Sequence, residues 1–191
     1  MGVRRDVYQR LGGFSKMRFG EDIDFSIRIF KAGCKCRLFP EAWVWHKRRT
    51  DFRKFWRQVY NSGIARINLY KKYPESLKLV HLLPMVFTVG VMLLLVGFLA
   101  GVVLFFALPA GMPQAAGIAL SVFSLLPLLL YSGIIFFDAT MQTNSEWIGL
   151  LAVRAAFTQL MGYGCGFLQA WWRRCVRGKD EFSAYRSNFY K

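Results

Sequence analysis

The sequence predicts a small α/β segment followed by an α-helical transmembrane region with two to three spans. No Asp, Glu, Lys or Arg occurs between Lys78 and Asp138. That run is far longer than the roughly 20 apolar residues that cross a bilayer once. The α/β part rests on a helical pattern followed by two short alternating segments. The predicted organisation is 1–50 for the α/β segment, 51–79 for an amphipathic basic helix and linker, 80–172 for the transmembrane region and 173–191 for a basic tail.

Within the first segment, residues 21–33 predict a helix. Apolar residues recur there at helical intervals, carboxylates occupy the first turn, where the helix dipole favours them, and a glycine follows the last turn. Residues 34–38 and 42–46 alternate like two short strands, and Pro40 separates them. These elements predict a helix–strand–strand fragment rather than a complete domain.

Residues 51–67 predict an amphipathic helix. One stripe is aromatic and aliphatic while the other is basic, a pattern typical of a helix that lies in the bilayer interface. A surface helix packed on its own domain is the alternative, and we favour the interface because a spanning segment follows directly. The apolar stripe comprises Phe52, Phe55, Trp56, Val59, Gly63, Ile64 and Ile67.

The apolar block divides at a turn-rich break, residues 108–113, which predicts spans of about 82–108 and 114–137. Segment 147–172 is also apolar, although an arginine and a glycine series interrupt it. Its length suffices for a third span, which we favour. Three spans would, however, place the basic tail opposite a cytoplasmic N-terminal part, against the positive-inside bias. Two spans with a re-entrant or interfacial third segment would keep both on one side.

The charge distribution limits the class of protein. Residues 1–79 hold 19 Lys/Arg against 7 Asp/Glu, residues 80–146 hold none against 2, and residues 147–191 hold 7 against 2. Basic segments beside apolar spans fit attraction to anionic lipid headgroups, and no nucleic-acid motif accompanies the charge. We therefore expect membrane lipids, not nucleic acid, as partners. The first two spans offer no ionisable residue to line a path, which argues against a transporter.

Side chains capable of chemistry gather at two places in the basic N-terminal segment. Glu21, Asp22 and Asp24 open the predicted helix, where neighbouring carboxylates can supply a general base or face a divalent cation. Helix capping is the structural alternative. His46 is followed by three cations at 47–49, and this combination would suit a diphosphate.

The order and spacing of these motifs resemble the C-terminal half of the catalytic domain of a family 2 glycosyltransferase with the GT-A fold. The resemblance covers about residues 1–70. It implies that the α/β segment is the C-terminal part of a GT-A domain, followed by the membrane anchor of many such bacterial enzymes. The motifs are Leu11-Gly12-Gly13-Phe14, Gly20-Glu21-Asp22-Ile23-Asp24-Phe25-Ser26-Ile27-Arg28, Ala32-Gly33, Pro40-Glu41-Ala42 and His46-Lys47.

The resemblance implies catalytic roles for the carboxylate pair. Asp22 matches the general base that deprotonates the acceptor hydroxyl as it attacks the anomeric carbon of a nucleotide sugar. Glu21 would orient the acceptor or support the base. Gly13 and Phe14 fall where the acceptor-side loop is expected.

It also implies a donor site. His46 matches the position that in some members completes a divalent-metal site, for Mn²⁺ or Mg²⁺, on the donor diphosphate. Arg48 and Arg49 would neutralise phosphate charge. The acceptor would be a glycan or a lipid-linked molecule, in cell-envelope polysaccharide biosynthesis at the cytoplasmic face of the inner membrane.

Two departures from the family pattern shape these expectations. Residues 55–58, Phe-Trp-Arg-Gln, stand where processive members carry Gln-x-x-Arg-Trp and do not match, which favours single-sugar transfer. The family's N-terminal half supplies nucleotide-binding strands and an Asp-x-Asp metal motif, and neither is found here. We therefore expect this chain to need that missing half for donor binding and turnover. The alternative function is a small non-enzymatic membrane protein that binds anionic lipid or a partner enzyme.

Overall fold

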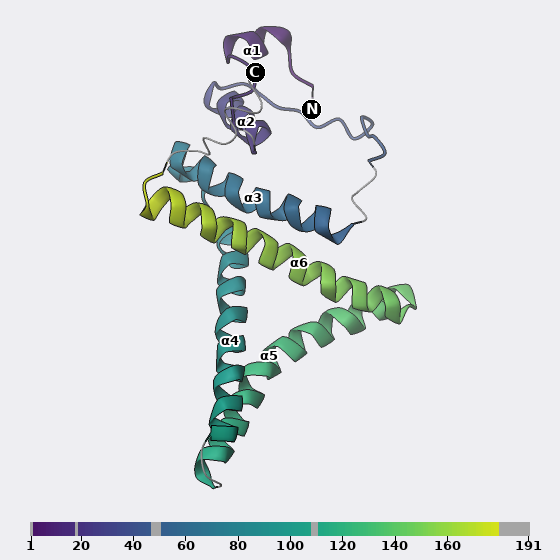
Figure 1. Ribbon diagram of the computed structural model, residues 1–191. Helices are drawn as coiled ribbons and strands as arrows, with labels where there is room; N and C mark the ends of the chain where they lie inside the picture. Colours follow the sequence, from purple (N-terminus) through teal and green to yellow (C-terminus); the bar gives the residue numbers. More distant parts are fainter. Residues whose placement is uncertain (1, 18, 47–50, 108–110, 180–191) are drawn as a thin grey trace. The chain divides into compact units, whose positions relative to one another are not determined.

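The computed structural model describes residues 2–17, 19–46, 51–107 and 111–179, and their regular structure is helical (Figure 1). The chain divides into two compact units, unit 1 (Met1–Lys78 with Gly166–Lys191) and unit 2 (Leu79–Cys165). The helices are α1 (Arg5–Arg10), α2 (Glu21–Lys31), α3 (Phe52–Lys72), α4 (Leu83–Ala107), α5 (Met112–Thr143) and α6 (Glu146–Trp171), with single turns at η1 (Pro74–Ser76), η2 (Leu79–His81) and η3 (Trp172–Val176).

The predicted α/β class is wrong for the described residues, which contain no strand. Segments 34–38 and 42–46 are irregular and largely exposed; Leu38 is 86% exposed and Trp45 is 91% exposed. Alternating side chains suit a strand, but a strand is stable only when its backbone groups pair with a neighbour and one face is covered. The described part of the chain supplies no such neighbour, so the expected GT-A sheet does not form there.

Helix α2 is observed where the sequence predicts it. It begins after Gly20, whose φ of 85° suits glycine, and no side chain caps this end. Carboxylates occupy the first turn instead. At the other end, the backbone N–H groups of Gly33 and Cys34 donate to carbonyls of the last turn, as the predicted terminal glycine implies.

Helix α3 is the predicted amphipathic helix and runs on to Lys72. The Asp51 carboxylate caps it by accepting from the backbone N–H groups of Arg53, at 2.7 Å, and Lys54, at 3.4 Å. Its buried face includes Ile64, Ile67 and Leu69. Within unit 1, α3 packs against the end of α6 and η3. The Tyr60 hydroxyl donates to Gln169, and Arg174 of η3 donates to Asn68.

In unit 2, the last turns of α4 lie side by side with the first turns of α5, and the two helices then diverge (Figure 1). Small residues allow this close approach. A Cβ added to Gly97 would lie 2.6 Å from Ser124 Oγ, and one added to Gly101 would lie 2.6 Å from the Gly117 carbonyl oxygen. Gly97 and Gly101 stand four residues apart, as do Gly117 and Ser121. This small-xxx-small spacing is present in the sequence itself.

Farther along unit 2, an aromatic cluster joins three helices. Phe87 of α4, Tyr131 of α5 and Phe157 of α6 lie with ring centroids 5.2 to 5.7 Å apart. The Thr88 hydroxyl donates to the Pro84 carbonyl at 2.8 Å and approaches the Leu160 carbonyl at 3.4 Å. In Figure 1, α6 crosses α4 instead of running alongside it.

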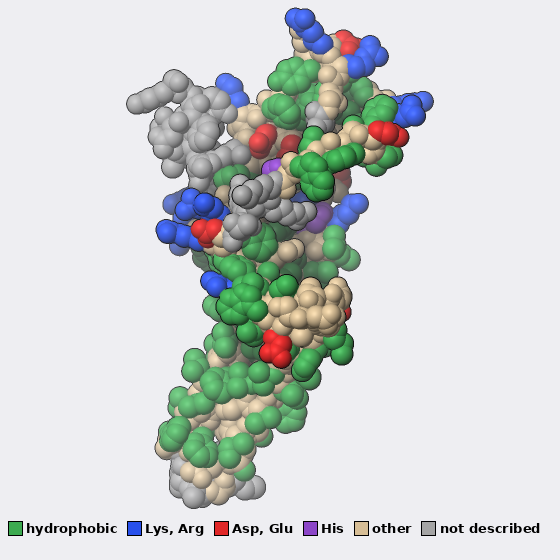
Figure 2. Space-filling view, turned by 90° about the vertical axis from the view of Figure 1, so that its right-hand side faces the viewer, with side chains coloured by type: hydrophobic (Ala, Val, Ile, Leu, Met, Phe, Trp, Pro, Cys, Tyr) green, Lys and Arg blue, Asp and Glu red, His purple; other side chains and the backbone are tan. Residues whose placement is uncertain are grey.

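Two helices of the described chain are long and apolar enough to span a membrane, Leu79–Ala107 and Gln114–Thr143. Only 11% and 6% of their apolar windows are buried, unlike the core helices of soluble proteins. On the face shown in Figure 2, green hydrophobic side chains predominate in the lower part of the molecule, with tan backbone and other side chains between them. The predicted third span, 147–172, coincides with a helix that does not meet the same criterion. These two helices indicate association with a membrane.

Candidate functional site

The centre of the candidate site is a buried carboxylate on α2. Asp24 is 0% exposed. Its Oδ2 accepts a hydrogen bond from Arg28 Nε at 2.9 Å, and its Oδ1 accepts from Lys72 Nζ at 2.5 Å. Lys72 lies at the end of α3, so this pair of contacts fixes α2 to α3.

Arg28 also connects α2 to the turn that follows α1. Its Nη1 donates to the Leu11 carbonyl at 2.5 Å and its Nη2 donates to the Gly13 carbonyl at 2.6 Å. One guanidinium thus holds the turn after α1 while its Nε is fixed by Asp24. The planar, multiply donating group of arginine suits such a role, and lysine could not reproduce it.

The turn itself requires glycine. Gly13 has a φ of 66°, and a Cβ there would lie 2.6 Å from Tyr8 Oη. Phe14 follows with half of its surface exposed, and its ring packs 5.0 Å from that of Phe25 on α2. The predicted acceptor-side residues Gly13 and Phe14 are therefore placed beside the helix that carries Glu21 and Asp22.

Burial by itself raises the pKa of Asp24, but hydrogen bonds from its neighbours, above all from Lys72, outweigh this effect. The pKa of Asp24 therefore lies below its usual range. Burial lowers the pKa of Lys72, yet the hydrogen bond to Asp24 leaves that pKa above its usual range. Both groups are held in their charged forms, as expected of a structural ion pair.

Glu21 and Asp22 stand in a different environment, although they are on the same turn. Asp22 is exposed and Glu21 is partly exposed. Asp22 Oδ1 accepts from the backbone N–H of Ile23 at 2.9 Å, and neither carboxylate is ion-paired with a described residue. An accessible carboxylate without a bound cation is free to accept a proton from a substrate.

Of the predicted donor-side residues, the structure describes only His46, and it does not bring His46 to this place. His46 is exposed, and nothing in the described residues joins it to Glu21 or Asp22. Arg48 and Arg49 lie outside the described residues. Within the described ranges, no three His, Cys, Asp or Glu side chains gather as metal ligands would. The described residues therefore do not fit a metal site of their own.

The sequence grouped Asp24 with Glu21 and Asp22, with helix capping as its structural alternative. No side chain caps this helix, and Asp24 forms an ion pair with Arg28 and Lys72 instead. The i,i+4 spacing of Asp24 and Arg28 is a signal for a helical ion pair. Lys72 is far away in the sequence, and no local pattern could have linked it to Asp24.

Comparison with known proteins identifies the class. A family model described as glycosyl transferase family group 2 matches residues 1–138. "Probable glycosyltransferase YdaM" of Bacillus subtilis (strain 168) is 32% identical over 56 residues, which cover 29% of this chain and 13% of that protein. No solved structure gives a significant match. Because the family model covers well over half of the sequence, the chain belongs to glycosyl transferase family group 2.

Proposed function

We propose that this protein takes part in transferring a sugar from a nucleotide-sugar donor to a glycan or lipid-linked acceptor at the cytoplasmic face of a membrane. The two apolar helices of unit 2 would anchor it there. The product would belong to the polysaccharides of the cell envelope. The observation that carries the proposal is the Glu21–Asp22 pair, which lies accessible at the start of α2 inside the segment matched by the family.

In this proposal Asp22 is the general base. Its carboxylate accepts the proton of the acceptor hydroxyl while that oxygen forms a bond to the anomeric carbon of the donor sugar. The bond from that carbon to the diphosphate oxygen breaks, and the nucleoside diphosphate leaves with the electron pair. General-base catalysis of this kind contributes typically 10²- to 10⁴-fold in rate.

The contrast between Asp22 and Asp24 supports this choice of base. Asp24 is buried and shared by two cations, so its proton affinity is reduced and no substrate can reach it. Asp22 is exposed and carries no such pairing in the described chain. Glu21, one residue away, would orient the acceptor, and Gly13 and Phe14 would line its approach.

A divalent cation, Mn²⁺ or Mg²⁺, on the donor diphosphate belongs to the proposal for the complete enzyme, with His46 as one ligand and Arg48 and Arg49 as phosphate contacts. The described residues do not supply a ligand set.

The test is a sugar-transfer assay in membranes with a panel of labelled nucleotide sugars. The complete polypeptide encoded by the reading frame that contains this chain would be compared with its Asp22→Asn variant. We expect Asp22→Asn to lower kcat by roughly 10²- to 10⁴-fold, because the substitution removes the base and keeps the shape. Glu21→Gln should raise KM for the acceptor more than it lowers kcat.

Asp6→Asn is the matched control, because Asp6 is an exposed carboxylate of unit 1 whose ion pair among the described residues is with the nearby Arg4 side chain. Its activity should equal that of the parent. If Asp22→Asn were as active as the parent, the base assignment would be wrong. If no nucleotide sugar supported transfer by the parent, a non-enzymatic role in binding anionic lipid or a partner enzyme would become the better account.

A further inference from the structure

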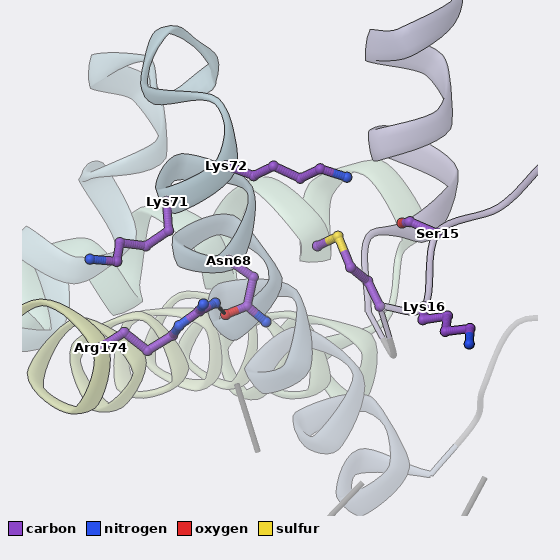
Figure 3. Close-up of a pocket in the computed structure, with 7 residues that line it drawn as sticks. Ser15, Lys16, Asn68, Lys71, Lys72 and Arg174 are labelled. Atoms are coloured by element: carbon purple, nitrogen blue, oxygen red, sulfur yellow. Dashed lines mark hydrogen bonds between the residues drawn. The ribbon is translucent and has the colours of Figure 1, made fainter. Parts of the chain in front are cut away.

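A basic pocket of about 350 Å³ lies in unit 1 (Figure 3). Its volume is within the range of small-ligand sites, which begin at about 300 Å³. The loop after α1, the last turns of α3 and η3 all contribute to it. The polar and charged lining residues are Ser15, Lys16, Asn68, Lys71, Lys72 and Arg174.

The charge of the pocket selects its ligand. Four of its lining side chains are cationic, and none of the lining residues that the structure describes is acidic. Lys72 is partly neutralised by Asp24. Lys71 is exposed and makes no hydrogen bond or ion pair with a described residue. Such a set of donors with excess positive charge suits an anion.

Asn68 and Arg174 give the pocket a fixed polar wall. Asn68 is only 6% exposed, and its Oδ1 accepts a hydrogen bond from Arg174 Nη1. That bond orients the guanidinium and leaves the Asn68 amide nitrogen without a partner in the described chain. Figure 3 shows these two side chains meeting, with Lys71 and Lys72 leaving α3 in opposite directions. An oriented guanidinium, an amide N–H and flexible ammonium groups are suited to phosphate oxygens.

The covalent path of the chain indicates where such a phosphate comes from. Only six residues, 73–78, separate Lys72 from Leu79, where the first apolar helix capable of spanning a membrane begins. Fully extended, this link reaches at most about 25 Å. The backbone of Lys72, one of the lining residues, is therefore tethered within that distance of the first residue of an apolar helix, and phospholipid headgroups are concentrated at the ends of membrane helices.

We propose that this pocket binds the phosphate group of an anionic membrane phospholipid. The inference goes beyond sugar transfer and does not depend on it, because none of the six residues belongs to the Glu21–Asp22 pair. Binding would hold the end of α3 at the headgroup layer.

The experiment uses the purified chain in detergent. Dioleoyl phosphatidic acid, dioleoyl phosphatidylcholine or inorganic pyrophosphate is added in measured amounts. Native mass spectrometry counts retained lipid, and thermal unfolding reports stabilisation. Phosphatidic acid should be retained in preference to phosphatidylcholine. Lys71→Gln and Arg174→Gln should each weaken its apparent affinity about fivefold, the effect expected for one cation near an anionic headgroup.

Lys54→Gln is the matched control, because Lys54 is an exposed lysine on the same helix that does not line the pocket. It should change the affinity by less than about twofold, since it contributes only to the general field. Lys71 is exposed and makes no hydrogen bond or ion pair with a described residue, so Lys71→Gln keeps the test interpretable if Arg174→Gln unfolds.

The proposal that the pocket binds lipid phosphate would be wrong if Lys54→Gln and Lys71→Gln lost equal affinity for phosphatidic acid. It would also be wrong if the chain showed no preference for phosphatidic acid over phosphatidylcholine. If pyrophosphate stabilised the chain as strongly as phosphatidic acid does, the ligand would not be a lipid, and the pocket would be a site for soluble phosphates. None of these measurements depends on sugar transfer, so a negative result for lipid binding is distinct from a negative result for the proposed function.

Discussion

Unit 1 and unit 2 are stabilised by different kinds of interaction. In unit 1, α2 is fixed to its surroundings by charged hydrogen bonds around the buried Asp24. In unit 2, α4 and α5 approach through Gly97 and Gly101, and an aromatic cluster joins the helices farther along. Between Lys78 and Asp138 no ionic interaction is available, so contact between backbones replaces it. Charged hydrogen bonds therefore position α2 in unit 1. In unit 2, glycines let the backbones of α4 and α5 come close together.

The largest structural effect is expected from Gly101→Leu in unit 2. The new side chain would collide with the Gly117 carbonyl and with Ser121, and backbone atoms cannot move away cheaply. We expect a cost of about 3 kcal/mol in the packing of α4 on α5. Hydrogen exchange in detergent should speed up in α4 and α5 and stay unchanged in α2.

Gly90→Leu is the control for that substitution. Gly90 is on the same helix, and nothing lies within 4 Å of a Cβ placed there. Exchange in this variant should equal or fall below that of the parent, because leucine favours helix more than glycine does. Equal damage from both substitutions would contradict the packing role of Gly101.

A smaller effect is expected from Asp24→Asn in unit 1. It leaves Arg28 and Lys72 without their anion, but both cations retain some access to water, which reduces the penalty. We expect a loss of about 2 kcal/mol, seen as faster exchange in α2 and the end of α3. Asp22→Asn, two residues earlier on the exposed face, should leave exchange unchanged. If the Asp24→Asn variant lost no stability, the ring contact between Phe14 and Phe25 would be enough to hold α2 in place.

The contribution of Asp24 should also depend on pH. Its pKa in the folded protein lies below its ordinary value of 3.8. A carboxyl with a depressed folded pKa stabilises the fold above its unfolded pKa, and this stability is lost as the pH falls through the folded pKa. The difference in exchange between parent and Asp24→Asn should therefore be full at neutral pH and shrink below about pH 4. A difference that persisted undiminished in strong acid would exclude the ion pair as its source.

The smallest effect is expected at the surface of unit 1. Lys31 Nζ and Glu75 Oε1 lie 2.5 Å apart, but more than half of each side chain is exposed. Solvent and salt screen such pairs, and many contribute nothing measurable. Glu75→Gln should leave hydrogen exchange in α2 and η1 unchanged. A measurable loss would mean that this pair, too, helps to fix α2.

The sequence by itself determined the helices and the family. Apolar runs predicted α4 and α5 because any helix of that length and hydropathy is stable in an apolar medium. The carboxylates of the first turn and Gly33 after the last turn delimited α2, and the motifs around Glu21 and Asp22 resemble the family that the chain belongs to. These are local properties, set by residues near one another in the chain.

Only the tertiary structure decided what depends on distant partners. The alternating segments 34–38 and 42–46 read as strands, yet strand formation requires a paired neighbour, and the described residues provide none. The structure also separated Asp24 from Asp22, because Lys72 reaches one carboxylate and not the other. Burial and ion pairing arise from contacts between residues far apart in sequence, and these contacts made one carboxylate of a single helical turn structural while its neighbour stayed accessible.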